Sequence, residues 1–585
     1  MNAYFDATMR LYLEKLIDWD SLLRLLREGK VEREAEVGAY RSVLETVAAL
    51  ASTFERPARE AWDAAAELTP DGGARPPAHI RKAYDALREN GLVALPVAEE
   101  YGGAAIPILI NGMVLEMISR ADTSLMTIIG LQSGTAGDIQ KFGSQDLKRT
   151  WLPRFTSGEV QGCMDLTEPQ AGSDLGQIST RATDLPDGTI RVDGQKIFIT
   201  NGGAEVHLVL ARDADTFESS RGTTNGLSLV LVARHRPDGT PNGVRVPRLE
   251  RKLGIHGSPT CEVVFEGAIG KRLGEKGRGF RAVLELMNNA RLGVAAQALG
   301  IAEAAFCEAA AYANQREQFG KPVAQQPLVQ SMLAKMAVNI EAARALLYRA
   351  LELYDFTLAA HAWLAAGRGS ATERAEVSAR LEREEIRVRL LTPLCKYFAT
   401  EICSDVTRDA VQVFGGIGYT MDVDAAKLHA DSLIMTIYEG TSEIQASFAL
   451  REMGKGALGT VFAEARRELE GIKLDPRRSA LASQVEQEIP RIENATKVLF
   501  GDISYALLRA KLLAEMVIDV LAATELLRQV GADSTRLDLA ESYVRRRMVQ
   551  VELGARRIEQ NHEGRMDRDA RVLAAWGVSG VSERS

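Results

Sequence analysis

The chain has 585 residues, of which 46% are hydrophobic and 26% are charged, a composition typical of globular proteins. A single hydrophobic core does not grow to this length, so we expect several domains. The net charge of −8 argues against a general affinity for nucleic acid.

The first 155 residues or so are predicted to be helical. Leucines between Leu11 and Leu25 recur near the helical period, and Ile80, Tyr84 and Leu87 do so again. Breaks are expected where proline and glycine gather, at 70–73, 75–77 and 101–103.

From about residue 160 to 285 the pattern changes to short β-branched runs. Thr189–Val192, Lys196–Thr200 and Leu227–Val232 are such runs. Asp-Gly or Asn-Gly pairs, which favour hairpin turns, flank them at 187–188, 193–194, 201–202 and 238–239. Their regular spacing predicts a small barrel or sandwich.

Beyond Phe280 the helical period returns. Ala-rich segments at 293–313, 328–350 and 396–413 are long enough for a four-helix bundle, and residues 366–388 resemble an insertion. No G-x-G-x-x-G follows a strand, and Gly274–Gly279 is interpreted as a flexible connection. Because helices and strands are segregated, the fold class is α+β. The predicted domains are an N-terminal helical domain, a middle β-barrel or sandwich, a helical bundle and a C-terminal helical extension, at 1–158, 159–283, 284–455 and 456–585.

The cysteines and histidines indicate no metal site. Five cysteines are scattered without C-x-x-C, as in reduced thiols of a cytoplasmic protein, and the seven histidines include no H-E-x-x-H. His256 and His429 are interpreted as packing or surface residues. We expect no signal peptide, because charged residues interrupt the early apolar ones, and no membrane span, because charges interrupt the most apolar stretches, 293–313 and 505–530.

The most informative segment is Ile437–Gln445, in which Glu439 stands between Tyr438 and Gly440. Ser442 and Gln445 have the spacing of a capping box, so a helix is predicted to begin there. Glu439 would lie on the loop before it, and Gly440 would allow a tight turn and the close approach of a ligand. Taken alone, Glu439 could equally be a loop acid that the helix dipole favours.

Five segments together resemble the acyl-CoA dehydrogenase family, in register across residues 35–453. They are Leu166-Thr167-Glu168-Pro169, Lys196-Ile197-Phe198-Ile199-Thr200-Asn201, Arg316-Glu317-Gln318-Phe319-Gly320, Val413-Phe414-Gly415-Gly416 and Tyr438-Glu439-Gly440-Thr441. The resemblance implies an FAD-dependent α,β-dehydrogenation of an acyl-CoA, with FAD and thioester between the middle domain and the bundle. Glu439 would remove the pro-R α-proton and flavin N5 would take the β-hydride. The thioester oxygen would accept hydrogen bonds from the N–H of Glu439 and from a flavin ribityl hydroxyl, which stabilise the enolate.

The resemblance also assigns binding residues. Leu166 and Thr167 match contacts to the flavin ring, Phe198 and Thr200 match the pair beside it, and Ser173 matches a residue near the pyrophosphate and the pantetheine. The other cofactor positions, which include contacts to a neighbouring subunit's FAD, are Arg316, Gln318, Phe319, Gln412, Gly416, Thr441 and Glu443. The substrate positions are Ser173, Asn288, Arg291 and Gly440. Without the resemblance, each would be read as a strand, bundle or solvated-face residue.

The chain departs from the family pattern in several places. Phe198 stands where many members carry tryptophan, Pro327 replaces a common cofactor-contacting glutamine, and Ala430 replaces an arginine that would pair with Asp431. The chain also continues about 130 residues beyond the usual end near 455, as in long bacterial members that include broad fatty-acyl and methylthiopropionyl-CoA dehydrogenases. In that group the extra helices can replace part of a tetramer interface, so a homodimer is predicted.

The expected function is an acyl-CoA dehydrogenase of fatty-acid β-oxidation that passes electrons to an electron-transfer flavoprotein. One alternative is an acyl-CoA oxidase that uses O₂. Another is a flavin-containing, DNA-associated protein of the alkylation response, which would need a basic C-terminal region. Residues 536–557 contain six arginines, but Asp538, Glu541 and Glu552 interleave with them, which favours a solvated helix face. The sequence leaves the length and branching of the acyl chain open.

Overall fold

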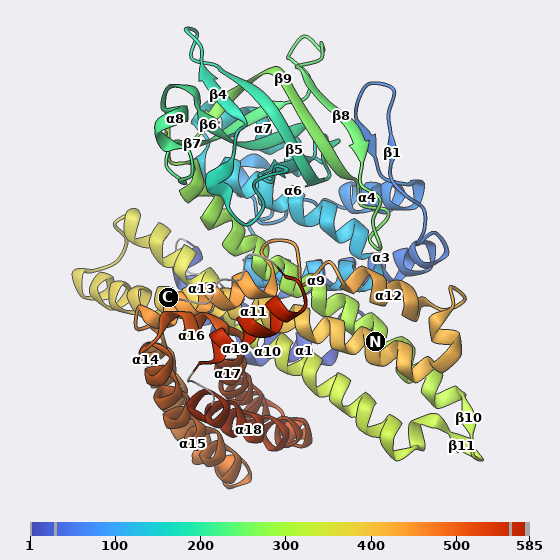
Figure 1. Cartoon of the computed structure of the whole chain (residues 1–585). Coiled ribbons are helices and arrows are strands. Elements are labelled where there is room, and N and C mark those ends of the chain that lie inside the picture. Colours follow the sequence, from blue (N-terminus) through green and yellow to red (C-terminus); the bar gives the residue numbers. More distant parts are fainter. Residues whose placement is uncertain (1–2, 28–31, 561–563, 579–585) are drawn as a thin grey trace. The chain divides into compact units, whose positions relative to one another are not determined.

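The computed structural model describes residues 3–27, 32–560 and 564–578. By its internal contacts the chain forms two compact units. The first comprises Met1–Met336 and Ala399–Glu439, and the second comprises Ala337–Phe398 and Gly440–Ser585. The predicted fold class is confirmed, since helices are followed by a closed strand barrel and then again by helices, of which the last described one ends at Ala575 (Figure 1).

The N-terminal region is helical, as predicted, apart from one short hairpin. In α3, buried Tyr40, Leu44, Val47, Ala51 and Phe54 recur at three- and four-residue spacing and make one apolar face. The region contains α1 (Ala7–Leu11), α2 (Trp19–Leu26), α3 (Arg33–Glu60), α4 (Ala78–Glu89), α5 (Ile108–Ala121), α6 (Thr123–Phe142), α7 (Gln145–Thr156), β1 (Glu67–Leu68) and β2 (Ala74–Arg75). The hairpin β1–β2 falls at the predicted proline- and glycine-rich break.

The middle region is a closed barrel, drawn in teal and green in Figure 1. Its strands are β3 (Gly162–Asp165), β4 (Arg181–Asp184), β5 (Ile190–Thr200), β6 (Val206–Asp213), β7 (Leu227–Ala233), β8 (Val244–Leu249) and β9 (Thr260–Leu273), with the short helix α8 (Phe217–Ser220) between β6 and β7. They are ordered β3-β6-β4-β5-β9-β7, and β7 also pairs with β6, which closes the circle. Valine, isoleucine and alanine side chains from β4–β9 fill the interior.

One predicted turn lies inside a strand. Asp187–Gly188 does form the turn between the antiparallel strands β4 and β5. The prediction of a turn at Asp193–Gly194 was wrong, because β5 runs through these residues with a register shift against β9. Gly194 has φ 155° there, and a Cβ atom would lie 2.5 Å from Thr180 Oγ1, so this glycine serves a β-bulge.

Long helices follow the barrel. They are α9 (Gly279–Gln315), α10 (Pro327–Ala365), α11 (Ala371–Phe414), α12 (Asp424–Ser432) and α13 (Ser442–Gly454), with the hairpin β10 (Glu317–Gln318) and β11 (Lys321–Pro322) between α9 and α10. The predicted insertion lengthens α11 and its link to α10. Among the described residues one helix, α9, is long and apolar enough to cross a membrane, but 72% of its most apolar window is buried within the fold, which fits a core helix.

The C-terminal extension consists of α14 (Ala457–Lys473), α15 (Pro476–Leu499), α16 (Ile503–Leu508), α17 (Ala510–Ala532), α18 (Leu537–Gln560) and α19 (Arg565–Ala575). It is joined to α10 by a buried charge cluster. Arg349 on α10 pairs with Glu468 on α14 at 2.9 Å and with Glu525 on α17 at 3.3 Å. These carboxylates compensate the cost of burying the guanidinium, so the extension belongs to the core of the second unit.

Candidate active site

Glu439 lies on the loop between α12 and α13 in an uncommon backbone conformation. Its φ is 55° and that of the following Gly440 is 91°, so both residues are in the left-handed region. A non-glycine residue held there costs about 1–3 kcal/mol, and such strain gathers at functional sites. One carboxylate oxygen of Glu439, Oε2, is shielded from solvent. The loop therefore presents a partly buried carboxylate just before a helix.

The predicted start of α13 is confirmed at Ser442, but the capping residue is Thr441, whose Oγ1 accepts a hydrogen bond from Ile444 N–H. The capping-box interpretation of Ser442 was wrong, because Ser442 is already in the first turn and Gln445 donates instead to the Gly440 carbonyl at 3.2 Å. Glu443 is exposed and pairs with Lys511 at 2.9 Å, which lowers the pKa of Glu443. This ion pair was not evident from the sequence.

A largely buried polar network begins at Tyr438, the residue before Glu439. The Tyr438 hydroxyl donates to Gln297 Oε1 on α9, and Gln297 Nε2 donates to Thr123 Oγ1 at 2.8 Å. Ser119 Oγ donates to the Gln297 carbonyl at 2.7 Å. Burial, and then the negative charge of Glu439, raises the pKa of Tyr438. Sequence reasoning missed this network, although the signal was present: Gln297 is a lone polar residue in an apolar, Ala-rich run.

The barrel brings two of the motif segments together. Ile197 N–H donates to the Thr167 carbonyl at 2.9 Å, and Lys196 Nζ donates to the Leu166 carbonyl at 2.9 Å. Phe198 stands at a second register shift of β5 with φ 58° and is 59% exposed. The bulge turns this aromatic ring away from the barrel interior. Leu166 and Thr167 are thus held beside the strand that carries Phe198 and Thr200.

A buried ion pair joins the same two segments. Glu168 and Lys196 are both buried, and Lys196 Nζ lies 2.8 Å from Glu168 Oε1. Burial alone would raise the pKa of Glu168, but the Lys196 ammonium and the donors Ser179 and Thr180 lower it to about 2. The sequence analysis placed Glu168 and Lys196 in two motifs but did not predict their ion pair, because that pairing depends on the strand register.

The other predicted residues lie on separate elements. Arg316 lies between α9 and β10 at the base of the β10–β11 hairpin, Gln318 is on β10, and Phe319 is in the turn, where it is 92% exposed. Gln412 and Gly416 are exposed at the end of α11, and Ser173 is exposed in the turn after Pro169. Arg291 is buried on α9. The Asn288 side chain lies outside the described residues.

Asp431 on α12 has a positively charged partner. Asp431 was expected to lack its usual arginine, but it pairs with Lys427 at 2.5 Å and accepts a hydrogen bond from Ile255 N–H, so a lysine one turn earlier on α12 takes the place of the missing arginine.

Cys163, Asp165 and His207, which are scattered in the sequence, meet inside the barrel. His207 Nδ1 lies 3.1 Å from both Cys163 Sγ and Asp165 Oδ2, as in a mutually hydrogen-bonded trio.

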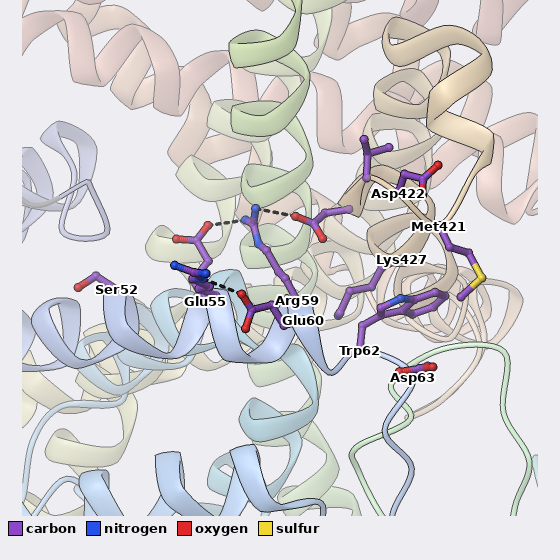
Figure 2. Close-up of a pocket in the computed structure, with 12 residues that line it drawn as sticks. Ser52, Glu55, Arg59, Glu60, Trp62, Asp63, Met421, Asp422 and Lys427 are labelled. Atoms are coloured by element: carbon purple, nitrogen blue, oxygen red, sulfur yellow. Dashed lines mark hydrogen bonds and ion pairs between the residues drawn. The ribbon is translucent and has the colours of Figure 1, made fainter.

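A surface hollow of about 810 Å³ lies between the end of α3 and the start of α12. Figure 2 shows Arg59 and Glu55 within it. Arg59 pairs with Glu55 on the same helix and with Asp424 on α12. Glu308 on α9 is a third partner of Arg59. None of the predicted site residues lines the hollow. Its charges pair with one another across three helices, which makes this a structural ion network.

Comparison with known proteins places the chain in a family. Residues 39–159, 163–268 and 277–454 match the family models described as the N-terminal, middle and C-terminal domains of acyl-CoA dehydrogenase. An acyl-CoA dehydrogenase of Bacillus subtilis is 35% identical over 364 residues, which cover 61% of this chain and 86% of that protein. The chain belongs to the acyl-CoA dehydrogenase family.

Two further acyl-CoA dehydrogenases match a larger share of the chain. A 3-methylmercaptopropionyl-CoA dehydrogenase of Ruegeria pomeroyi is 32% identical over 451 residues, covering 74% of this chain and 73% of that protein. A crystal structure of an acyl-CoA dehydrogenase complexed with FAD from Bacillus anthracis shares the fold at a TM-score of 0.75 and 22% identity, covering 96% of this chain and 95% of that one. The fold with a C-terminal extension therefore occurs elsewhere.

Acyl-CoA dehydrogenases use FAD, and the residues of this chain fit that cofactor. Thr167 and Thr200 offer hydroxyls beside Phe198, whose exposed ring suits a flat aromatic ligand. Arg316, at the end of α9, offers a cation for phosphate. At Gly416 a Cβ atom would meet nothing within 4 Å, which leaves room for a ligand against the backbone. The donors are thus hydroxyls, a guanidinium and open backbone, as a dinucleotide requires.

Proposed function

We propose that this chain catalyses α,β-dehydrogenation of an acyl-CoA thioester, with Glu439 as the base that removes the α-proton. The observation that carries the proposal is the backbone of Glu439, a left-handed carboxylate-bearing residue followed by a left-handed glycine at the mouth of α13. Strain of this kind persists only where the surroundings enforce it, and it serves a carboxylate that must face one direction.

The chemistry explains the parts of the site. An α-proton of a thioester is weakly acidic, so the enolate must be stabilised as the proton leaves. Glu439 accepts the proton on its carboxylate, and its backbone N–H serves as a donor to the thioester oxygen, as in the family. The buried Tyr438–Gln297–Thr123 network provides an ordered, water-poor wall beside the base. FAD, when bound, supplies the acceptor for the hydride that leaves the β-carbon.

The chain's own residues hold the two ligands. Thr167, Phe198 and Thr200 would position the flavin ring. Arg316 and Gln318 would reach the phosphates and the adenine of the FAD bound to a neighbouring subunit. Arg291 on α9 would line the path of the CoA. Because the hairpin and the barrel face would then serve different copies, the proposal includes a homodimer. Light scattering should give a mass of twice 63.7 kDa, and a mass four times that of the chain would remove this part.

The proposed electron acceptor is an electron-transfer flavoprotein. The nearest alternative, an oxidase, uses the same base and cofactor with O₂. An anaerobic assay with a dye or with electron-transfer flavoprotein separates the two. Turnover with the dye and little peroxide in air supports the dehydrogenase, whereas peroxide formed in stoichiometry with substrate supports the oxidase.

The substrate is proposed to be a saturated fatty acyl-CoA or a 3-methylthiopropionyl-CoA, which are the substrate classes of the long family members that this chain resembles. The deciding experiment is a panel of acyl-CoA thioesters of different length and branching, scored anaerobically by bleaching of the flavin. Rapid bleaching by one group of saturated thioesters supports the proposal. Failure of every thioester to bleach an FAD-loaded protein would refute it.

A role in DNA binding is less well supported. Arg545 and Arg556 each pair with a glutamate four residues earlier on α18, at 2.6 Å, and Arg547 pairs with Asp519 at 2.7 Å. Arginines engaged in this way offer less charge to phosphates than a free basic stripe would. A gel shift at physiological salt that is positive for any DNA sequence would revive this alternative.

A further inference from the structure

Lys396 is a lysine of α11 whose side chain is buried, with 0% exposure. Burying an ammonium group is costly unless its N–H donors are engaged. Lys396 Nζ lies 2.8 Å from the carbonyl oxygen of Gly440. Gly440 directly follows Glu439 in the chain, so a buried cation is attached to the backbone of the loop that carries the base.

The Gly440 carbonyl is held from two sides. Besides Lys396, the buried Gln445 donates to it through Nε2 at 3.2 Å. Gln445 packs closely on Gly440, since a Cβ atom at Gly440 would lie 2.7 Å from Gln445 Nε2. These two side chains therefore fix the peptide group that joins Gly440 to Thr441.

Such fixing is needed because the neighbouring backbone is strained. Glu439 at φ 55° and Gly440 at φ 91° lie in a loop between helices, where no hydrogen-bond ladder imposes the conformation. Left-handed residues persist only where the surroundings over-determine them. A charge-assisted hydrogen bond is about twice as strong as a neutral one, so a lysine holds the carbonyl more firmly than a neutral side chain would.

We propose that Lys396 is a positioning residue for catalysis, which sets the direction of the Glu439 carboxylate and N–H by holding the Gly440 carbonyl. The proposal rests on the proposed function, in which Glu439 is the base. Lys396 touches neither the reacting atoms nor the proton. It acts through the backbone, so its loss should slow the chemical step and leave substrate binding largely intact.

The competing explanation is that Lys396 only stabilises the fold. That explanation predicts a lower melting temperature with unchanged turnover per bound flavin. Lys427 provides a matched control, because it is also buried and also bonded to a backbone-anchored partner, Asp431, but on α12 rather than at the base loop. Lys427→Met should destabilise the protein and leave turnover per bound flavin unchanged.

The test compares Lys396→Met, which removes the donors, and Lys396→Gln, which keeps a neutral donor, with wild type and Lys427→Met. The FAD-loaded proteins are mixed anaerobically with the best acyl-CoA, and single-turnover flavin bleaching, kcat and KM are measured. Misplacing a reacting group by about 1 Å costs about 100-fold in rate. Bleaching and kcat should fall about 10- to 100-fold in Lys396→Met and about 5- to 10-fold in Lys396→Gln, with KM within about threefold of wild type.

A second readout does not depend on turnover. A 3-oxoacyl-CoA forms an enolate that resembles the deprotonated substrate. Its binding can be followed by the long-wavelength absorbance of the complex between the enolate and the flavin. Lys396→Met should weaken this absorbance, and Lys427→Met should not. Bleaching and absorbance within about threefold of wild type in a folded, FAD-loaded Lys396→Met would overturn the inference, and if that variant does not fold, the same result in Lys396→Gln would.

The two proposals can fail separately. An inactive Glu439→Gln together with a fully active Lys396→Met would overturn only the role of Lys396. An active Glu439→Gln would overturn the base itself and, with it, the role of the lysine.

Discussion

Replacing Lys196 with methionine should reveal how strongly the buried ion pair holds the barrel. Lys196→Met keeps the length and apolar stem of the side chain but leaves the Glu168 carboxylate buried without its cation. Lys196 also donates to the carbonyls of Leu166 and Leu210, at 2.9 and 2.7 Å, and these bonds are lost too. Removing one partner of a buried pair typically costs about 3–5 kcal/mol.

The pH dependence gives an independent magnitude. A pKa of Glu168 lowered from 4.5 to about 2 corresponds to about 3 kcal/mol of stability. Because the folded pKa is depressed, this contribution is present above pH 4.5 and is lost as the pH falls through about 2. Without Lys196, burial raises the pKa of Glu168, so the gain in unfolding free energy between pH 3 and pH 5 should shrink.

The assay is urea unfolding followed by circular dichroism between pH 3 and pH 7. Lys276→Met is the control, since Lys276 pairs with Asp184 and Asp215 on the same barrel but is 42% exposed, and exposed pairs contribute at most about 1 kcal/mol. The double variant Glu168→Gln/Lys196→Met should be more stable than Lys196→Met, because no unpaired charge stays buried. A Lys196→Met protein within about 1 kcal/mol of wild type at pH 7 would refute the reasoning.

Two further predictions concern the loop that carries Glu439 and the C-terminal extension. Gly440→Ala should lower kcat at least about tenfold with FAD retained, because Gly440 has φ 91° and lacks room for a Cβ atom. The control Gly188→Ala, in an open turn with φ 79°, should lower the unfolding free energy by about 1–3 kcal/mol and leave kcat unchanged. Equal kcat in both variants would contradict this prediction. Burial raises the pKa of Asp519 to about 6, so its stabilising contribution is present below pH 4 and about 3 kcal/mol is lost as the pH rises through 6. Asp519→Asn should flatten the melting temperature across that window, and an unchanged slope would count against it.

Much of the fold could be predicted from the sequence. The change from helical to alternating periodicity marks the barrel, and the Asp-Gly turn at Asp187 fixes the β4–β5 hairpin. The prediction of a turn at Asp193–Gly194 was wrong because the same Asp-Gly dipeptide can form either a hairpin turn or a β-bulge. Sequence spacing does not distinguish the two, since the difference lies in which strand is paired opposite.

The site was partly accessible in the same way. The helix predicted to begin at Ser442 placed Glu439 on the loop before it, where the structure has it. The partners that hold the site, Lys196 with Glu168, Tyr438 with Gln297 and Lys396 with Gly440, are separated by 28, 141 and 44 residues. Such pairs meet only through tertiary packing, so a single sequence gives no spacing rule by which to find them.

The most direct test of the central claim is anaerobic flavin bleaching by acyl-CoA in Glu439→Gln. Glutamine keeps the size of the side chain but cannot accept the α-proton. We expect yellow, FAD-loaded protein that bleaches at least about 10³-fold more slowly than wild type, the scale of removing a positioned base. Bleaching within about tenfold of wild type would contradict the assignment of Glu439.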